Sequence, residues 1–435
     1  MPLHRSLVEL RMLLGAGHLT ATELVTAALE ALARTQPTLN AFVAVHRARA
    51  LAEAARPGGG PLAGVPIAVK DNLDEAGVPG PAGCRAYRDR IPPRDATAVA
   101  RLRAAGAVIV GRTNMHELAD GITSANPHHG PVRNPWGRDR HPGGSSGGSG
   151  AAVAAGVVPA ALGTDTGGSV RIPAALCGVV GLKPTRGLVP TGGVVPLSPT
   201  LDHVGVLTRS VADAAALLAV LAPAAAEPLA RPGRGRLRLG VLEGFAADAD
   251  GPVGACFAAA LRVLEGLGAR LRAVSVPRLA EAGRLLGRIY RPEAARAHAL
   301  QLAARPADFG AEVRATLERG LRADPAGREA ALRERELLAA EVAAAMEDVD
   351  LLVSPTTPHP AGPLGAPGPA TYLAFTCPFN LTGQPALSLP MGLVDGLPVG
   401  LQLAGRPGED ARLLWEAAAL EERLGFDHSP AGRGV

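Results

Sequence analysis

Two clusters of glycine and serine carry the residues of this sequence that could perform nucleophilic chemistry. The first runs from His141 to Gly150 and the second from Gly163 to Ser169, so that Ser145 and Ser169 lie 24 residues apart. A serine hydroxyl becomes a nucleophile when a base removes its proton, and glycine lets the backbone approach a ligand closely. The chemistry therefore depends on which residue supplies the base.

Lysine is rare in this chain. Of the 44 lysine and arginine residues, two are lysine, Lys70 and Lys183, and the other 42 are arginine. A buried lysine can lose its proton, whereas an arginine in a protein keeps its charge. A chain that uses arginine almost everywhere is expected to keep lysine where this difference matters. Lys70 is therefore the candidate base, while a packing role stays open for both lysines, and more so for Lys183.

The first cluster permits three other interpretations. A flexible linker is disfavoured because the apolar run 151–162 follows at once. A P-loop needs a lysine that is absent, and a dinucleotide-binding turn needs a preceding strand, which residues 131–142 do not form. A nucleophile elbow fits Gly143–Gly147 formally, but it also needs that strand and a histidine, for which His203 is the best candidate.

The expected strands bring Lys70 and Ser169 together. Residues 65–69 are predicted to form a buried strand that ends at Lys70, and residues 157–162 form a strand that runs into the second cluster. The carboxyl ends of strands in one sheet converge, and α/β proteins bind ligands there. Backbone N–H groups after the second strand can form a concave site for an oxyanion; they belong to Thr166, Gly167, Gly168 and Ser169.

Strands alternate with helices along the whole chain, which predicts the α/β class. Other strands are expected at 40–45, 107–110, 179–183, 237–242, 269–276, 351–354, 386–389 and 399–403, and helices at about 6–14, 20–33, 47–55, 95–105, 150–156, 211–221, 330–347 and 411–424. Thr20 and Glu23 form a capping box, and Asp95 is the expected N-cap of its helix. The Pro/Ala-rich stretch 222–235 is the one candidate boundary, but the strands after it favour a single domain over residues 1–435.

Charge and composition exclude several classes of protein. The net charge is +4 and the arginines are scattered, so no nucleic-acid-binding tail is expected; the basic run 231–238 is interpreted as a solvated linker. No segment resembles a signal peptide or a transmembrane helix. The cysteines form no CxxC motif, so neither a zinc site nor a disulfide framework is expected; they are Cys84, Cys177, Cys256 and Cys377. We expect a cytoplasmic protein without a metal or a cofactor.

Four segments closely resemble the amidase signature family. They are 64–72 (GVPIAVKDN), 142–149 (PGGSSGGS), 163–174 (GTDTGGSVRIPA) and 178–185 (GVVGLKPT). The likeness extends over about 5–425 and is loose in 225–345. It implies a central mixed sheet covered by helices on both faces, with a signature core at about 61–210. The spacings of 75 residues from Lys70 to Ser145 and 24 from Ser145 to Ser169 agree with the family's Ser-Ser-Lys triad.

This resemblance assigns roles to the three candidate residues. Ser169 is the nucleophile that attacks the amide carbonyl, Ser145 relays its proton, and Lys70 is the base. Family members hold the relay serine on a cis peptide, which implies a cis bond between Gly144 and Ser145. The N–H groups of 166–169 would stabilise the oxyanion, and water would cleave the acyl-enzyme.

The resemblance also implies contacts around the triad. A backbone carbonyl in the segment that aligns with Ala119 contacts the substrate in the family. Asp165 and Arg171 bracket the nucleophile turn and are interpreted as its supports, with ordinary surface pairing as the alternative. The role of Lys183 stays open.

The family includes the glutamine-hydrolysing A subunit of the tRNA-dependent amidotransferase, which works with partner chains. In that protein an acid before a Pro-x-Asn-Leu-x-Gly stretch helps to hold the glutamine amino group. Here the stretch is Pro378–Gly383, the aligned position is close to Leu373, and residues 370–379 contain no acid. We therefore expect a free-standing amidase for a small molecule, monomeric or homodimeric, which binds no nucleic acid directly and no membrane. The glutamine-hydrolysing protein of the amidotransferase and an inactive scaffold are the alternatives.

Overall fold

The computed structural model describes residues 2–223 and 236–428. The predicted linker 222–235 and the basic run 231–238 therefore fall largely outside the described residues. Among the helices of the described ranges, none is both long enough and apolar enough to cross a membrane.

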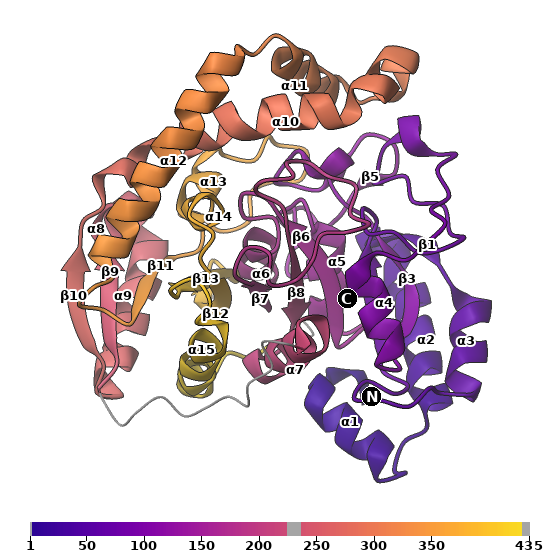
Figure 1. Cartoon of the computed structure of the whole chain (residues 1–435). Coiled ribbons are helices and arrows are strands. Elements are labelled where there is room, and N and C mark those ends of the chain that lie inside the picture. The colour runs from indigo at the N-terminus through magenta and orange to yellow at the C-terminus, as the bar shows by residue number, and fades with distance from the viewer. Residues whose placement is uncertain (1, 224–235, 429–435) are drawn as a thin grey trace.

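An 11-stranded mixed sheet runs through the molecule (Figure 1). From one edge to the other its strands are β1 (Phe42–Val45), β3 (Val108–Thr113), β2 (Pro66–Lys70), β6 (Ala160–Asp165), β8 (His203–Thr208), β7 (Val180–Lys183), β12 (Ala386–Val394), β13 (Leu397–Ala404), β11 (Leu351–Pro355), β9 (Arg238–Leu242) and β10 (Arg270–Val274). β3, β2 and β6 are parallel. Every step from β6 through β8, β7, β12 and β13 to β11 is antiparallel. The expected α/β class with a mixed sheet is confirmed.

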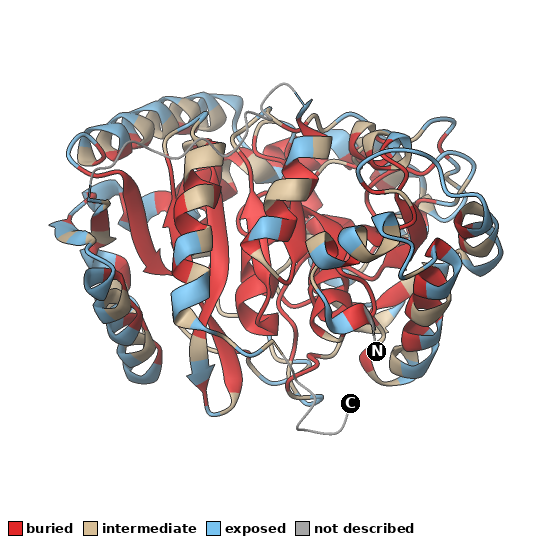
Figure 2. Ribbon diagram, turned by 90° about the horizontal axis from the view of Figure 1, so that it is seen from below, coloured by how far each residue is buried: buried red, intermediate tan, exposed pale blue. Residues whose placement is uncertain are grey.

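Helices cover the sheet. Their bounds are α1 (Leu7–Gly15), α2 (Ala21–Leu39), α3 (Arg47–Ala55), α4 (Thr97–Ala104), α5 (Gly147–Ala154), α6 (Arg171–Cys177), α7 (Val211–Leu221), α8 (Glu243–Asp248), α9 (Gly251–Gly266), α10 (Ala282–Ala304), α11 (Ala311–Leu321), α12 (Pro325–Ala345), α13 (Thr371–Thr376), α14 (Pro378–Leu381) and α15 (Asp410–Leu424). Every residue of β2, β3, β6, β7, β8 and β11 is buried. Figure 2 shows these buried strands between helices whose outer residues are exposed. Strands covered on both faces are apolar along most of their length.

Of the two helix caps predicted from the sequence, one is confirmed and the other is wrong. Thr20 and Glu23 form the predicted capping box at the start of α2, and their side chains each accept a hydrogen bond from the other's backbone N–H. Asp95 does not cap α4, because Ala96 occupies the N-cap position. The Asp95 carboxylate instead accepts from the Ala76 N–H at 2.7 Å and fastens a neighbouring loop.

Two strands near the centre of the sheet differ from the prediction. β8 was not predicted, although it lies between β6 and β7. β6 begins three residues later than expected and extends to Asp165, because residues 155–159 form the turn after α5. Thr164 and Asp165 therefore belong to a rigid strand rather than to a loop.

The described part of 225–345, where the sequence resembles the family only loosely, lies at the outside of the molecule. In Figure 1, α10, α11 and α12 lie along one side of the molecule, outside the strands. Residues of α10 and α11 line the same cavity as Ser169. This part of the chain therefore borders the predicted site as well as the exterior.

Candidate active site

Lys70 lies at the carboxyl end of β2 and is completely buried. Its Nζ atom donates to Ser145 Oγ at 2.7 Å and to Thr164 Oγ1 at 2.8 Å. Burial lowers the pKa of Lys70 to about 7, although the carboxylates of Asp165 and Asp202 act in the opposite direction. Lys70 can therefore be neutral near pH 7, as a base must be.

Ser145 is held by its backbone. The Gly144–Ser145 peptide bond is cis, as the family resemblance implied. The Ser145 carbonyl accepts from the His116 N–H at 3.1 Å and from Ser124 Oγ at 3.2 Å. These bonds fix the residue so that its hydroxyl points to Lys70.

Ser169 lies in the turn between β6 and α6 and borders a cavity. The Ser146 N–H donates to the Ser169 carbonyl at 3.2 Å, so the two glycine-serine clusters are adjacent in space. Gly168 has a φ of +139°, and a Cβ there would lie 2.1 Å from Thr376 Oγ1. Thr376 Oγ1 in turn donates to the Gly167 carbonyl at 2.5 Å. The turn therefore requires glycine and is clamped by α13.

The N–H groups of this turn are available for a ligand. Those of Thr166, Gly167, Gly168 and Ser169 donate to no protein acceptor in residues 2–223 and 236–428. Thr166 Oγ1 donates to Asp202 Oδ1 at 2.6 Å, which anchors the start of the turn. Successive free N–H groups in a turn can bind an anion. The oxyanion site therefore stays a prediction, and the free donors of this turn are consistent with it.

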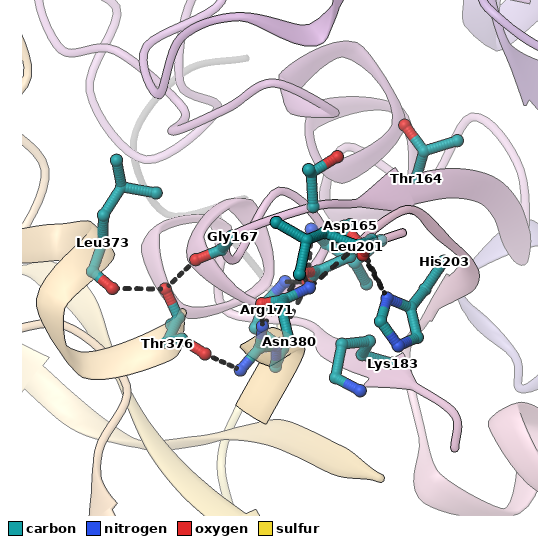
Figure 3. A network of polar contacts seen from close by, with 12 residues as sticks. Thr164, Asp165, Gly167, Arg171, Lys183, Leu201, His203, Leu373, Thr376 and Asn380 are labelled. Atoms are coloured by element: carbon teal, nitrogen blue, oxygen red, sulfur yellow. Dashed lines mark hydrogen bonds and ion pairs between the residues drawn. The ribbon is translucent and has the colours of Figure 1, made fainter. Parts of the chain in front are cut away.

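Asp165 and Arg171 form a fully buried ion pair, with 2.9 Å between Asp165 Oδ1 and Arg171 Nη2 (Figure 3). Arg171 also donates to the Thr376 carbonyl at 2.7 Å and to Asn380 Oδ1 at 2.6 Å. Burial raises the pKa of Asp165, but the charge of Arg171 and hydrogen bonds from Arg171 and Asn380 outweigh it and hold the pKa well below its usual range. The alternative of surface pairing is wrong, because neither side chain reaches solvent.

Two further candidates from the sequence, His203 and Lys183, lie beside this ion pair (Figure 3). His203 Nδ1 is 2.7 Å from the Leu201 carbonyl, which leaves the ring bound to backbone rather than to a serine. The nucleophile-elbow alternative therefore has no histidine at this position. Lys183 Nζ donates to the carbonyls of Pro184 and Gln384, and burial places its pKa well below the usual value. Lys183 ties β7 to the segment before β12.

A cavity of about 300 Å³ lies over Ser169. Ala119 borders it with a φ of +64°, and Leu373 borders it at the position where the sequence lacks an acid. A larger hollow of about 810 Å³ lies between α1, the start of α2 and residues 54–63, and none of the predicted site residues lines it. The smaller cavity is the candidate substrate site.

Three residues that make hydrogen bonds to the site residues were not predicted from the sequence. Thr164 accepts from Lys70, Asp202 anchors Thr166, and Asn380 donates to the Asp165 carboxylate at 2.8 Å. Thr164 belongs to the second glycine-serine cluster at the carboxyl end of β6, the strand that pairs with β2, and this is the signal that could have indicated it. Asp202 and Asn380 come from distant segments, and nothing local in the sequence indicates them.

One group of side chains resembles a set of metal ligands. Cys84, Glu117 and His128 bring one ligand atom each within 4.8 Å. Glu117 already accepts from His128 Nε2 at 2.8 Å and from the Gly310 N–H at 3.0 Å. Burial raises the pKa of the Cys84 thiol, which disfavours the thiolate that a metal needs. We interpret the group as a hydrogen-bonded contact to α11, and the expectation of no metal stays a prediction.

Known proteins resemble this chain over nearly its full length. Residues 23–414 match the family model described as Amidase. The A subunit of the glutamyl-tRNA(Gln) amidotransferase of Thermus thermophilus is 41% identical over 98% of both chains, and the protein of the same name from Symbiobacterium thermophilum is 40% identical over 96% of both. Since these matches cover almost the whole chain, the chain belongs to the amidase family.

Solved structures agree with this assignment. A crystal structure of an amidase has a TM-score of 0.92 and 40% identity, and covers 97% of this chain and 100% of that chain. 6-Aminohexanoate cyclic dimer hydrolase with its substrate has a TM-score of 0.92 and 32% identity over 98% of both chains. The glutamyl-tRNA(Gln) amidotransferase protein from Thermotoga maritima has a TM-score of 0.78 and 34% identity, over 92% of this chain and 91% of that one. The chain is thus an enzyme that acts on C–N amide bonds, and the inactive-scaffold alternative is not supported.

One expectation is corrected by these relatives. We expected a monomer or homodimer whose only partner is a small amide, but the curated relatives are named as one subunit of an amidotransferase. The expectation relied on the missing acid in 370–379. A side chain in a pocket gives information about the substrate and not about partner subunits. The missing acid was therefore no evidence that the enzyme is free-standing.

Proposed function

We propose that this chain is the amide-hydrolysing subunit of an amidotransferase, in which it releases ammonia from glutamine. The observation that carries the proposal is the 41% identity to the A subunit of a glutamyl-tRNA(Gln) amidotransferase over 98% of both chains. We also propose that it acts in the cytoplasm, consistent with four free cysteines.

In this proposal Lys70 is the base. Neutral Lys70 takes the proton of Ser145 over the 2.7 Å hydrogen bond, while Ser145 takes the proton of Ser169. Ser169 Oγ then attacks the amide carbon, and the oxygen becomes an oxyanion bound by the N–H groups of 166–169. Donors fixed before the reaction need no reorganisation when charge develops, which supports this role for the turn.

The proton then returns by the same path. Ser145 passes it to the leaving nitrogen, the C–N bond breaks, and ammonia departs from the acyl-enzyme ester on Ser169. Water attacks the ester, its proton moves through Ser145 to Lys70, and the carboxylate leaves as Ser169 regains a proton. Asp165 and Arg171 hold the turn in place throughout, without a role in proton transfer.

The signature core and the segment with the looser resemblance have different roles in this proposal. We propose that 61–210 is the catalytic core, because Lys70, Ser145 and Ser169 all lie in it. We propose that the described part of 225–345 forms a wall of the substrate cavity, since Leu286 and Tyr290 of α10 and Thr316 of α11 border it.

A second candidate function is hydrolysis of a less polar amide. Leu373 borders the cavity where the family's glutamine-hydrolysing subunit carries an acid. The TM-score to 6-aminohexanoate cyclic dimer hydrolase is 0.92, against 0.78 for the amidotransferase protein of Thermotoga maritima. These two observations favour a substrate other than glutamine.

Ammonia release separates the two candidates. The purified chain, and the complex isolated with a tag on the chain, are given glutamine and a panel of aliphatic, aromatic and ureido amides. Glutamine as the best substrate, with a higher rate in the complex, supports the amidotransferase function. Turnover of other amides with none of glutamine supports the second function, and Ser169→Ala provides the background rate.

A further inference from the structure

Asp120 presents a carboxylate at the substrate cavity. It directly follows Ala119 and borders the same cavity as Ser169. Its Oδ2 atom is buried, and no hydrogen-bond donor in the described part of the chain reaches it. The mechanism above makes no use of this carboxylate.

The groups around Asp120 do not neutralise it. Tyr290 and Arg291 from α10 and Glu312 and Thr316 from α11 border the same cavity. Burial and, to a smaller extent, the Glu312 carboxylate raise the pKa of Asp120 to about 6, because they outweigh the hydrogen bonds from the Thr316 and Tyr290 hydroxyls and the charge of Arg291. Within the described ranges Asp120 takes part in no ion pair closer than 4.0 Å. A buried carboxylate without a close opposite charge is costly, so it favours a cation in the cavity.

We propose that Asp120 binds a protonated amine on the acyl part of the amide substrate, so that the enzyme prefers amides whose acyl chain carries an ammonium group. This inference rests on the proposed hydrolysis at Ser169. The segment 370–379 offers no acid at this cavity, since Leu373 is apolar and residues 370–379 lack Asp and Glu. Asp120 therefore supplies to the cavity a negative charge that the segment 370–379 lacks.

A pair of substrates isolates this contact. 4-Aminobutanamide and butanamide have the same chain length and differ by one ammonium group. A hydrogen bond to a charged group adds about tenfold to a hundredfold in affinity. For the wild-type enzyme we expect kcat/KM to favour 4-aminobutanamide by that factor, and Asp120→Asn to bring the ratio close to one, mainly through KM.

A matched control removes another negative charge from the same cavity. Glu312 has a side chain 77% exposed, so water screens it, and Glu312→Gln should keep most of the preference. A wild-type ratio near one overturns the proposal. So does an Asp120→Asn variant that lowers kcat/KM equally for both amides, because that result indicates a purely structural role.

Binding to Ser169→Ala separates this inference from the proposed function. The affinity of each amide is measured by calorimetry with Ser169→Ala alone and with Asp120→Asn added. If wild type hydrolyses no amide, the proposed function fails, yet tighter binding of 4-aminobutanamide that is lost with Asp120→Asn still supports the ammonium site. Equal binding of both amides to Ser169→Ala overturns the proposal of an ammonium site at Asp120. This comparison does not require the Asp120→Asn variant to fold.

Discussion

Arg171 Nη2 lies 2.9 Å from Asp165 Oδ1, and neither side chain has any exposed surface. The same guanidinium donates to Thr376 in α13, Asn380 in α14 and Gln402 in β13. One side chain therefore joins the turn that carries Ser169 to elements more than 200 residues further along the chain.

Arg171→Lys should destabilise the protein although it keeps the charge. Lysine cannot reproduce the forked donor geometry, so Asp165 and Asn380 would lose partners in a buried site. We expect a loss of about 3–5 kcal/mol in the free energy of unfolding, measured by urea denaturation. Arg272→Lys is the control, because its ion pair with Asp348 is 60% and 70% exposed and should contribute less than about 1 kcal/mol. Equal effects of the two variants would contradict this role of Arg171.

Lys70→Arg should remove most amide hydrolysis. Arginine keeps its proton and cannot act as the base, and loss of general-base catalysis costs about 10²–10⁴ in kcat. Lys70→Met tests the same step without adding a buried charge. Steady-state ammonia release, with circular dichroism to verify folding, measures the effect. A near wild-type rate for Lys70→Arg would require another base.

Activity should rise with pH through about 7. Burial lowers the pKa of Lys70 to about 7, so the neutral base is populated above that pH and lost below it. We expect kcat/KM to fall about tenfold for each pH unit below the midpoint and to level off above it. A profile measured between pH 5 and 9 that is flat would argue against a titrating lysine.

Asp202→Asn should move that profile to lower pH. The Asp202 carboxylate favours the charged form of Lys70, so removal of its charge lowers the pKa of Lys70 further. The pKa of Asp202 itself is raised by burial to about 6, which leaves it charged at the midpoint in the wild type. An asparagine can still accept from Thr166 Oγ1. Asp89→Asn, at a side chain 65% exposed, is the control and should leave the midpoint unchanged. A midpoint that rises in Asp202→Asn would refute the stated effect of this carboxylate.

The sequence indicated the main contact of the site because it depends on strand ends. Parallel strands bring their carboxyl ends together, and Lys70 at the end of β2 accordingly lies beside β6, the strand that runs into the second cluster. The contact of Lys70 with Ser145 was implied by the family resemblance and not by strand ends. β8 was not predicted, although Val204 and Val206 alternate with other residues as in a strand.

Other features of the site could not be predicted from local sequence. Asp202 acts on Thr166 across 36 residues, and Arg171 reaches Gln402 across 231. The Asp120 carboxylate, with its buried Oδ2 atom, borders a cavity that residues of α10 and α11 also line, and these helices lie far from it in the sequence. Burial and long-range pairing are properties of the folded chain, and the spacing of residues in the sequence does not predict them.

The most direct test of the nucleophile is mass spectrometry after reaction with a serine-directed fluorophosphonate. We predict one adduct on the peptide that contains Ser169, formed faster above pH 7 than below it, and none on Ser145. Ser169→Ala should then carry no adduct while it remains folded. An adduct on Ser145, or labelling of Ser169→Ala at the wild-type rate, would contradict the assignment of Ser169 as the nucleophile.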